Sequence, residues 1–268
     1  MRATEAVDPA DVAAELAACV REAGMLALSM FKSPIKTWTK GASSPVCEAD
    51  IAVDRLLRER LTSRRSGFGW LSEEADDDDT RLGAHFVWVV DPIDGTRAYL
   101  AGLPDWAISV ALVETGRPIA ACLYAPVTEE LFVASTDNGA TCNGAAIAAT
   151  PGASLGDIRI AGPKDFLKRF AAIAPPCTAV PRMPSLALRL ARVAQGAIDV
   201  AIASADSHDW DLAAADLLVH EAGGLLTSFA GHAVTYNQPV PRHQMLVAAG
   251  RDRHPTVIEL LGDERLAS

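Results

Sequence analysis

The sequence lacks the features that mark membrane proteins, disulfide-stabilised proteins and thiolate zinc sites. No run of about 18 consecutive apolar residues occurs, and acidic residues precede the first amphipathic segment, so we expect neither a membrane span nor a signal peptide. The five cysteines are scattered and form no Cys-x-x-Cys pair, which argues against a disulfide framework or a zinc site built from thiolates. We therefore expect a cytoplasmic protein with reduced thiols.

Positive charge is also scarce. The chain carries 24 Lys and Arg residues against 34 Asp and Glu residues, which gives a formal net charge of -10. Binding to a nucleic-acid polymer depends mainly on neutralising phosphates with Lys and Arg, so a nucleic-acid partner is not expected. An acidic protein that binds a phosphorylated substrate at acidic residues needs cations to reverse the local field.

Apolar residues are plentiful enough for a large core. Half of the 268 residues are hydrophobic, which suits one large domain or two interlocked halves. The composition shifts to Gly, Pro, Ala and Ser at 150–155, and we place a boundary there. We predict an N-terminal α+β half at 1–150, which carries most candidate metal ligands, and a C-terminal α/β half at 151–268, which carries Asp211.

The strongest local signal lies in the middle of the chain, where an apolar run passes into an acidic turn. Phe86–Val90 is short, β-branched and aromatic, as is typical of a buried strand. Pro92 cannot donate a hydrogen bond to a sheet and biases the residue before it toward an extended conformation. We therefore predict that this strand ends as Asp91 appears.

The turn that follows carries two aspartates three positions apart. Asp91 and Asp94 precede Gly95, so their carboxylates can converge while the amides of Gly95 and Thr96 remain free to bind an anion. A purely structural interpretation, in which the aspartates accept local hydrogen bonds, explains this motif equally well when it is taken alone.

Further acidic residues stand where other predicted strands end or helices begin. Glu73 follows an apolar strand-like run, Asp50 lies in the first turn of a predicted helix, and Asp211 opens another helix. Each has a structural explanation by itself, because helix N-termini favour negative charge. Ligand sites in layered α/β proteins gather at such ends, and carboxylates without His or Cys partners suit a hard cation such as Mg²⁺. Together these residues predict a magnesium site for an anionic substrate.

A separate acidic run occupies positions 76–79. Four consecutive aspartates resemble a metal site, but this run lacks the spacing and the glycine of a calcium loop. We expect a solvated loop, in which replacing any one aspartate by asparagine changes almost nothing.

Four acidic motifs occur in order over most of the chain. They read Val46-Cys47-Glu48-Ala49-Asp50, Ser72-Glu73-Glu74, Asp91-Pro92-Ile93-Asp94-Gly95-Thr96 and Trp210-Asp211-Leu212-Ala213-Ala214. In these motifs the chain resembles the inositol monophosphatase family of Mg²⁺-dependent, Li⁺-sensitive phosphatases, which also includes 3'(2'),5'-bisphosphate nucleotidases and fructose-1,6-bisphosphatases. The resemblance implies an α+β or α/β fold, a layered αβαβα sandwich of the inositol monophosphatase or sugar phosphatase type.

The resemblance also implies which residues bind metal. Glu73, Asp91 and the backbone carbonyl of Ile93 would hold the ion that activates water. Asp91, Asp94 and Asp211 would hold a second ion, placed to stabilise the leaving oxygen. The implied cofactor is two or three Mg²⁺ ions.

Catalytic and phosphate-binding roles follow from the same resemblance. The amides of Gly95 and Thr96 would bind the phosphate. Thr96 with Asp50 would orient the nucleophilic water, and Glu73 would assist. Two metal ions can stabilise both the attacking and the departing oxygen of an in-line displacement, so no covalent phosphoenzyme is needed.

The chain departs from the family pattern around the substrate. Cys47 stands where members usually have Thr, and Pro184-Ser185-Leu186 replaces a segment of glycine and two small residues. Inositol-preferring members carry Glu seven residues before the aspartate of the fourth motif, where this chain has Ser204. We expect substrate contacts from Asp94, Ser185 and Ser204. The change at Ser204 leaves room for a nucleotide such as 3'-phosphoadenosine 5'-phosphate.

The resulting prediction is a Mg²⁺-dependent phosphomonoester hydrolase acting on a small phosphorylated metabolite, either inositol monophosphate or a 3'(2'),5'-bisphosphate nucleotide. A haloacid-dehalogenase-type phosphatase is one alternative, but it needs Asp-x-Asp at a strand end, and two residues separate Asp91 from Asp94. A non-catalytic interaction protein on the same fold is another. Members of the resembled family are often dimers, which makes a homodimer the implied assembly.

Overall fold

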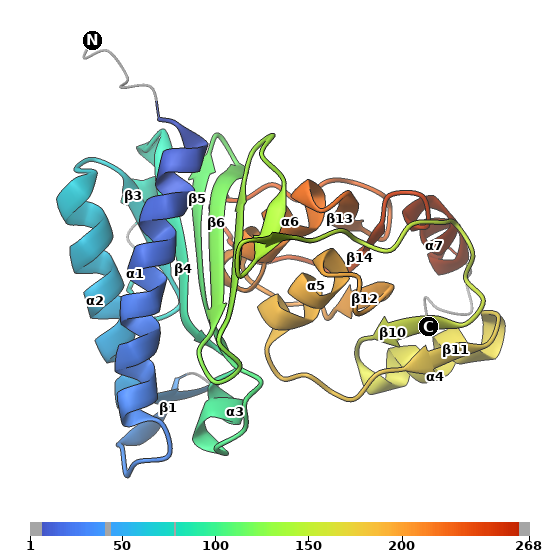
Figure 1. The fold of residues 1–268 in the computed structure, drawn as a ribbon, viewed down its shortest axis with the longest axis horizontal. Coiled ribbons are helices and arrows are strands. Elements are labelled where there is room, and N and C mark those ends of the chain that lie inside the picture. Colours follow the sequence, from blue (N-terminus) through green and yellow to red (C-terminus); the bar gives the residue numbers. More distant parts are fainter. Residues whose placement is uncertain (1–6, 41–43, 78, 263–268) are drawn as a thin grey trace.

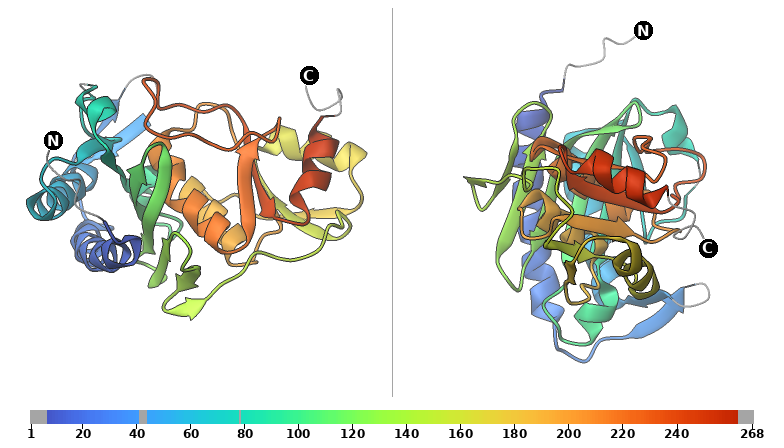
Figure 2. Two further views of the ribbon diagram at one scale, coloured as in Figure 1. Left: turned by 90° about the horizontal axis from the view of Figure 1, so that it is seen from above. Right: turned by 90° about the vertical axis from the view of Figure 1, so that its right-hand side faces the viewer.

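The computed structural model describes residues 7–40, 44–77 and 79–262, which form alternating layers of helices and sheets (Figure 1). Two helices cover the outer face of a first sheet, two helices lie between the first and a second sheet, and two more cover the far face of the second sheet. The view from above in Figure 2 shows the same succession of layers. The layered αβαβα arrangement predicted from the sequence is confirmed.

The first sheet has seven strands in the order β3-β4-β5-β6-β7-β8-β9. Its strands are β3 (Gly69–Ser72), β4 (Phe86–Asp94), β5 (Ala107–Glu114), β6 (Arg117–Ala125), β7 (Glu130–Ser135), β8 (Ala140–Cys142) and β9 (Ala145–Ala146). Neighbouring strands are antiparallel except for β3 and β4, which run parallel. The residues that follow β3 and end β4 therefore lie at the same edge of the sheet.

Helices α1 (Pro9–Met30) and α2 (Glu48–Arg64) pack on the outer face of this sheet. Helix α1 begins at Pro9, because the Asp8 side chain accepts a hydrogen bond from the Ala10 amide at 2.9 Å and Pro9 occupies the first turn. Apolar residues at helical spacing, among them Val12, Leu16 and Val20, are fully buried against the sheet. A two-stranded hairpin, β1 (Thr37–Lys40) and β2 (Ser44–Cys47), leads into α2.

The second sheet has five strands in the order β11-β10-β12-β14-β13. They are β10 (Ile158–Ala161), β11 (Cys177–Ala179), β12 (Val200–Ala203), β13 (Gly224–Ser228) and β14 (Leu246–Gly250). Helices α5 (Leu186–Ala194) and α6 (Asp209–Glu221) fill the space between the sheets, while α4 (Lys164–Ile173) and α7 (His254–Leu261) lie on the outer face. Within the described ranges, no helix has both the length and the apolar character needed to cross a membrane.

Strand β4 runs further than the sequence predicts. It continues through Asp91 to Asp94, with Asp91 opposite Ser109 and Asp94 opposite Ala107 on β5. The predicted end at Asp91 is therefore wrong. The register shifts between Asp91 and Asp94, and such an irregularity absorbs Pro92, which has no amide hydrogen to donate. A short helix, α3 (Thr96–Leu100), follows at once.

The acidic run at 76–79 is only partly a solvated loop, and Asp78 lies outside the described residues. Arg81 in the 3₁₀ helix η1 (Thr80–Gly83) is 1% exposed and donates to both carboxylate oxygens of Asp77, through Nε at 3.0 Å to Oδ1 and through NH2 at 2.6 Å to Oδ2. Its NH1 donates to Asn237 Oδ1 at 2.7 Å. The expectation that every aspartate of the run is merely solvated is therefore wrong at Asp77.

Replacing Asp77 tests this contact. Asp77→Asn leaves the buried Arg81 guanidinium without its counter-charge, so we expect the free energy of unfolding to fall by about 2 kcal/mol. Urea denaturation at neutral pH measures the change. Asp76→Asn, an exposed neighbour in the same run, is the matched control and should unfold like the wild type. Equal midpoints for both variants would contradict the assigned role of Asp77.

A buried carboxyl group on α6 makes stability depend on pH. Asp216 is 9% exposed and accepts a hydrogen bond from the Tyr236 hydroxyl at 2.9 Å. Burial raises the pKa of Asp216 to about 6, above its ordinary value of 3.8. Between about pH 4 and 6 the folded protein therefore binds more protons here than the unfolded chain does, and stability falls as the pH rises.

Asp216→Asn removes this titration while keeping an oxygen that can accept from Tyr236. Relative to the wild type, we expect the variant to gain up to about 3 kcal/mol of unfolding free energy between pH 4 and pH 8. Urea unfolding of both proteins across this range measures the gain. Asp165→Asn, at an exposed position on α4, should show no such pH-dependent difference. Parallel pH profiles for wild type and Asp216→Asn would refute the assignment.

Candidate metal centre and active site

Three carboxylates from two elements converge between the sheets. Asp91 and Asp94 lie at the end of β4, and Asp211 lies in the first turn of α6. Each offers one oxygen, and these oxygens all lie within 4.8 Å of one another. Asp91 is 1% exposed and Asp94 is 6% exposed. The structure thus brings Asp211 close to Asp91, although 120 positions separate them in the sequence.

Glu73 joins this group from the neighbouring strand. It directly follows β3, and its amide donates to the Val90 carbonyl of β4 at 3.2 Å, which places it at the edge where the parallel strands β3 and β4 end. Burial, with the added repulsion of Asp211, raises the pKa of Glu73 to about 8. Burial and the charge of Asp94 likewise raise the pKa of Asp211 to about 7.

These shifts have one physical origin. Burial and the neighbouring Glu73 and Asp94 carboxylates also hold the pKa of Asp91 well above its ordinary range. Four crowded carboxylates repel one another strongly when ionised, since little water screens them. Near pH 7 the negative charge of the group must therefore be neutralised by bound protons or by cations. One divalent cation offsets two carboxylate charges, whereas one proton offsets only one.

The donor set fits such a cation. Among the described residues, Asp91 Oδ1 is a buried oxygen with no hydrogen-bond partner. A buried polar atom without a partner is costly, and a metal ion would supply the missing interaction. The candidate ligands around it are all oxygens, including the carbonyl of Ile93 on the wall of the same cavity, and hard cations such as Mg²⁺ prefer oxygen ligands.

Asp94 is held by the N-terminus of α5. It accepts hydrogen bonds from the Ser185 hydroxyl and from the amides of Leu186, at 3.3 Å, and Ala187, at 2.6 Å. Free amides at a helix N-terminus stabilise a carboxylate. Ser185 is fully buried and its hydroxyl donates to Asp94, so the predicted contact between Ser185 and the substrate stays a prediction.

Asp50 and Thr96 form a second hydrogen-bonded group beside the cluster. The Thr96 hydroxyl lies 3.2 Å from Asp50 Oδ1 and 3.1 Å from the Ile93 carbonyl, and it can donate to either. Both the amide and the thiol of Cys47 donate to Asp50 Oδ2, at 2.9 and 2.8 Å. Cys47 therefore supplies a side-chain donor to Asp50 despite its departure from the family pattern. Burial raises the pKa of Asp50.

Gly95 connects the end of β4 to α3. Its φ of +97° lies in the left-handed region, and a Cβ added there would lie 2.8 Å from the Asp105 carbonyl oxygen. Only glycine fits both conditions. The amides of Gly95 and Thr96 stand at the start of α3, where a helix offers no internal acceptor, so they can bind an anion.

A cavity of about 870 Å³ gives access to these groups. It is lined by the predicted residues Glu73, Asp91, Ile93, Asp94, Gly95, Thr96, Ser204 and Asp211. Asp50 does not line it but accepts a hydrogen bond from Thr96, which does. The sequence analysis missed three charged residues of its wall, Arg97, Arg182 and Asp206. The position of Arg97 directly after the hexapeptide was an available signal, and Arg182 stands between two prolines.

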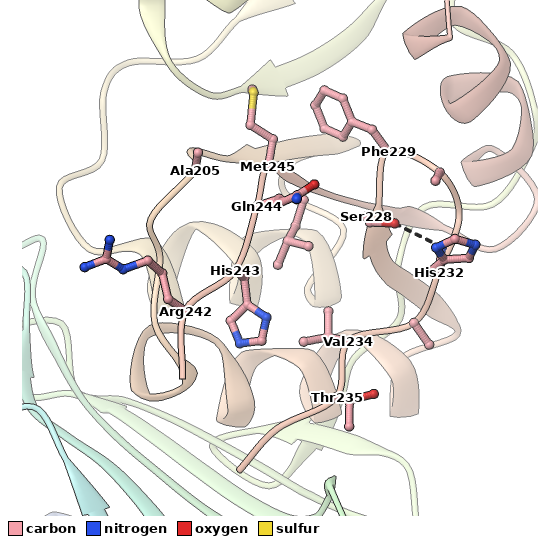
Figure 3. A pocket seen from close by; sticks show the side chains of 13 residues that line it. Ala205, Ser228, Phe229, His232, Val234, Thr235, Arg242, His243, Gln244 and Met245 are labelled. Carbon is pink, nitrogen blue, oxygen red and sulfur yellow. Dashed lines mark hydrogen bonds between the residues drawn. The ribbon is translucent and has the colours of Figure 1, made fainter. Parts of the chain in front are cut away.

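A second cavity of about 800 Å³ lies behind this wall, around β13 and β14 (Figure 3). The segment 204–206 separates the two, because Ala205 lines the second cavity while Ser204 and Asp206 line the first. His243 lies in the second cavity with Nε2 2.6 Å from Asp209 Oδ1. None of the residues predicted to bind metal or phosphate lines this second cavity.

Comparison with known proteins identifies the family of this chain. The model of the inositol monophosphatase family matches residues 8–265. An inositol-1-monophosphatase of Rhizobium meliloti is 35% identical over 201 residues, which cover 72% of this chain and 75% of the relative. A histidinol-phosphatase of Mycobacterium tuberculosis is 36% identical over 207 residues, which cover 73% of this chain and 78% of the relative.

Solved structures share the fold. The extragenic suppressor protein suhB of Bartonella henselae superposes with a TM-score of 0.83 at 26% identity, covering 94% of this chain and 99% of that one. The carboxylate cluster, the glycine turn and the layered fold thus occur in a chain that a single family model spans almost completely. On these findings the chain belongs to the inositol monophosphatase family.

Proposed function

We propose that this protein is a Mg²⁺-dependent phosphomonoester hydrolase that uses two or three ions and a water nucleophile. The observation that carries the proposal is the buried, unpartnered Asp91 oxygen within a carboxylate group that opens onto a cavity. Membership of a phosphatase family supports it. A role in binding an anionic substrate would explain why the carboxylate group lines an open cavity. Bound cations would give this acidic cavity the positive charge that attracts the substrate.

The proposed ligands are the residues that the geometry groups around Asp91. Glu73, Asp91 and the Ile93 carbonyl would hold one ion, and Asp91, Asp94 and Asp211 a second. When bound, such ions lower the pKa of water and stabilise charge on the attacking and leaving oxygens of the phosphate.

The chain's own residues orient the reactants. Asp50 accepts from the Thr96 hydroxyl, which leaves the Thr96 oxygen able to accept a hydrogen bond from water. Glu73 lines the same cavity and can accept the proton that the water loses. The amides of Gly95 and Thr96 would bind the phosphate oxygens. The ends of β3 and β4 and the first turns of α2 and α3 hold these donors and acceptors in place before the substrate binds, which would lower the barrier.

Several substrates fit this chemistry. Our proposal retains inositol monophosphate and 3'(2'),5'-bisphosphate nucleotides, and the name of the 36% identical relative adds histidinol phosphate. The relatives' names point to different substrates at similar identity, so they do not rank these candidates. We also propose that the protein forms a homodimer and is located in the cytoplasm. The boundary between its N-terminal and C-terminal halves is placed near residue 150.

Asp94→Asn tests the metal site. Removing one ligand charge should lower phosphate release at saturating Mg²⁺ by about 100-fold or more, since the ions stabilise the transition state. Release is measured with a panel of inositol 1-phosphate, 3'-phosphoadenosine 5'-phosphate, fructose 1,6-bisphosphate and histidinol phosphate. Asp206→Asn is the matched control, because it removes the same charge from the same cavity at a residue already paired with Arg242.

We expect Asp206→Asn to keep turnover within about threefold, in line with the small contribution of exposed ion pairs. Unchanged turnover in Asp94→Asn would remove Asp94 from the metal site. Wild-type activity that persists after divalent ions are chelated would overturn the proposed function itself. A phosphoaspartate trapped on Asp91 would instead support the covalent haloacid-dehalogenase-type mechanism.

Ser185→Ala tests whether Ser185 positions a metal ligand. The variant loses the hydroxyl that donates to Asp94 and accepts from the Leu188 amide at 3.0 Å. We expect the Mg²⁺ concentration for half-maximal thermal stabilisation to rise about tenfold or more, because groups that orient ligands tune metal affinity. Ser204→Ala changes a hydroxyl on the cavity wall and should leave this concentration unchanged. If Ser185→Ala and the wild type reach half-maximal thermal stabilisation at the same Mg²⁺ concentration, Ser185 only caps α5.

A further inference from the structure

One positive charge on the cavity wall has no counter-charge. Arg182 is exposed and lines the cavity that contains the carboxylate group. Among the described residues, no carboxylate lies within ion-pair distance of Arg182. The acidic residue Asp206 on the same wall differs, because Arg242 NH1 lies 3.4 Å from its Oδ1. Cations would neutralise the central carboxylates, so the charge of Arg182 on the cavity wall would stay uncompensated.

A second guanidinium beneath it strengthens this local field. Arg189 on α5 donates from NH1 to the Ile202 carbonyl at 3.1 Å, while its buried Nε has no partner among the described residues. Burial lowers the pKa of Arg189, the charge of Asp94 opposes that change, and the charge of Arg182 adds to it. Arg182 and Arg189 therefore lie close enough to repel each other, and Arg189 is also close enough to Asp94 to be attracted by it. Such an arrangement favours an anion.

The backbone that carries Arg182 is fixed at both ends. The Val180 amide donates to the Ile160 carbonyl at 2.9 Å before it, and Ser185 caps α5 after it. Pro181 and Pro184 flank the arginine and restrict the backbone dihedral angles between these anchors. Binding a ligand therefore costs little backbone entropy here. Pro184, which stands at the glycine of the family segment, contributes to that stiffness.

We propose that Arg182 is a specificity-determining residue that binds a second oxyanion group of the substrate, so that the preferred substrate is a phosphomonoester carrying a further phosphoryl or carboxylate group. This proposal rests on the proposed function and specifies its substrate class. The reacting phosphate would be bound by the amides of Gly95 and Thr96 and by the metal ions, so Arg182 remains available for a second anionic group. The cavity, at about 870 Å³, is of the size that encloses a whole small metabolite. An arginine fork matches the planar or tetrahedral oxygens of either anion.

Matched substrate pairs test the role of Arg182. The first pair is 3'-phosphoadenosine 5'-phosphate and adenosine 3'-monophosphate, which differ only in the second phosphate. The second pair is 2-phosphoglycerate and glycerol 2-phosphate, which differ in a carboxylate. For each pair, kcat/KM with Mg²⁺ and the equilibrium Kd by calorimetry with Ca²⁺ are compared in wild type, Arg182→Gln and Arg242→Gln.

The wild type should prefer the doubly anionic member of at least one pair, and the pair that shows this preference identifies the anion as phosphoryl or carboxylate. In Arg182→Gln we expect kcat/KM and affinity for that member to fall about 10- to 100-fold, the range of a hydrogen-bonded charge pair. The singly phosphorylated member should change much less. Arg242→Gln removes an equal charge near the same wall and should retain the preference.

Several outcomes would overturn the proposal. Equal losses for both members of a pair would show that Arg182 acts on the reacting phosphate or on folding, and a circular-dichroism melt separates these two causes. No loss for any substrate, or no preference in the wild type, would show that Arg182 does not select the substrate. If the Kd difference depends on Arg182 while no substrate is turned over, the proposed hydrolase function fails and the binding role of Arg182 stands.

Discussion

The mutual repulsion of buried carboxylates is the constraint on which the site depends. Glu73, Asp91, Asp94 and Asp211 face one another where little water screens their charges, and their pKa values rise accordingly. A fold that only needed to be stable would not place four acids there, since each ionised group costs free energy without a partner. A bound cation would relieve this repulsion, because the same oxygens that repel one another are favourable ligands for a hard ion.

The layers of the fold hold these acids in place from several directions. The parallel pairing of β3 and β4 aligns Glu73 with the end of β4, and the irregular register of β4 presents Asp91 and Asp94 together. Helices α5 and α6, which lie between the sheets, contribute the amides that hold Asp94 and the side chain of Asp211. The packing of the two sheets on these helices therefore sets the geometry of the carboxylate group that we propose as the metal site, and substitutions in that shared core should affect it.

Much of this site could be predicted from the sequence because its signals are local. The strand at Phe86, the glycine after Asp94 and the acidic first turns of α2 and α6 each follow from a few adjacent residues. The resemblance to a known family then assigned their roles. The extension of β4 past Asp91 was missed, because the irregular pairing that accommodates Pro92 depends on β5.

Contacts across long sequence separations could not be predicted. Ser185 reaches Asp94 across 91 positions, and only the packing of α5 against the end of β4 buries its hydroxyl. In the sequence Asp77 looks like one of four equivalent aspartates, but in the structure it is paired with Arg81, which also donates to Asn237, 156 positions after Arg81. Arg182 carries no motif at all, and its position on the cavity wall follows from the segment that joins β11 to α5.

We propose that the unpartnered oxygen of Asp91 and the carboxylates around it bind divalent cations. The most direct test is anomalous diffraction from crystals of the protein grown with Mn²⁺, which stands in for Mg²⁺ and scatters strongly enough to be located. Our account predicts anomalous peaks within bonding distance of Asp91, with Glu73 on one side and Asp94 and Asp211 on the other. Crystals that bind Mn²⁺ only elsewhere, or that leave the Asp91 carboxylate without an ion at saturating Mn²⁺, would contradict it.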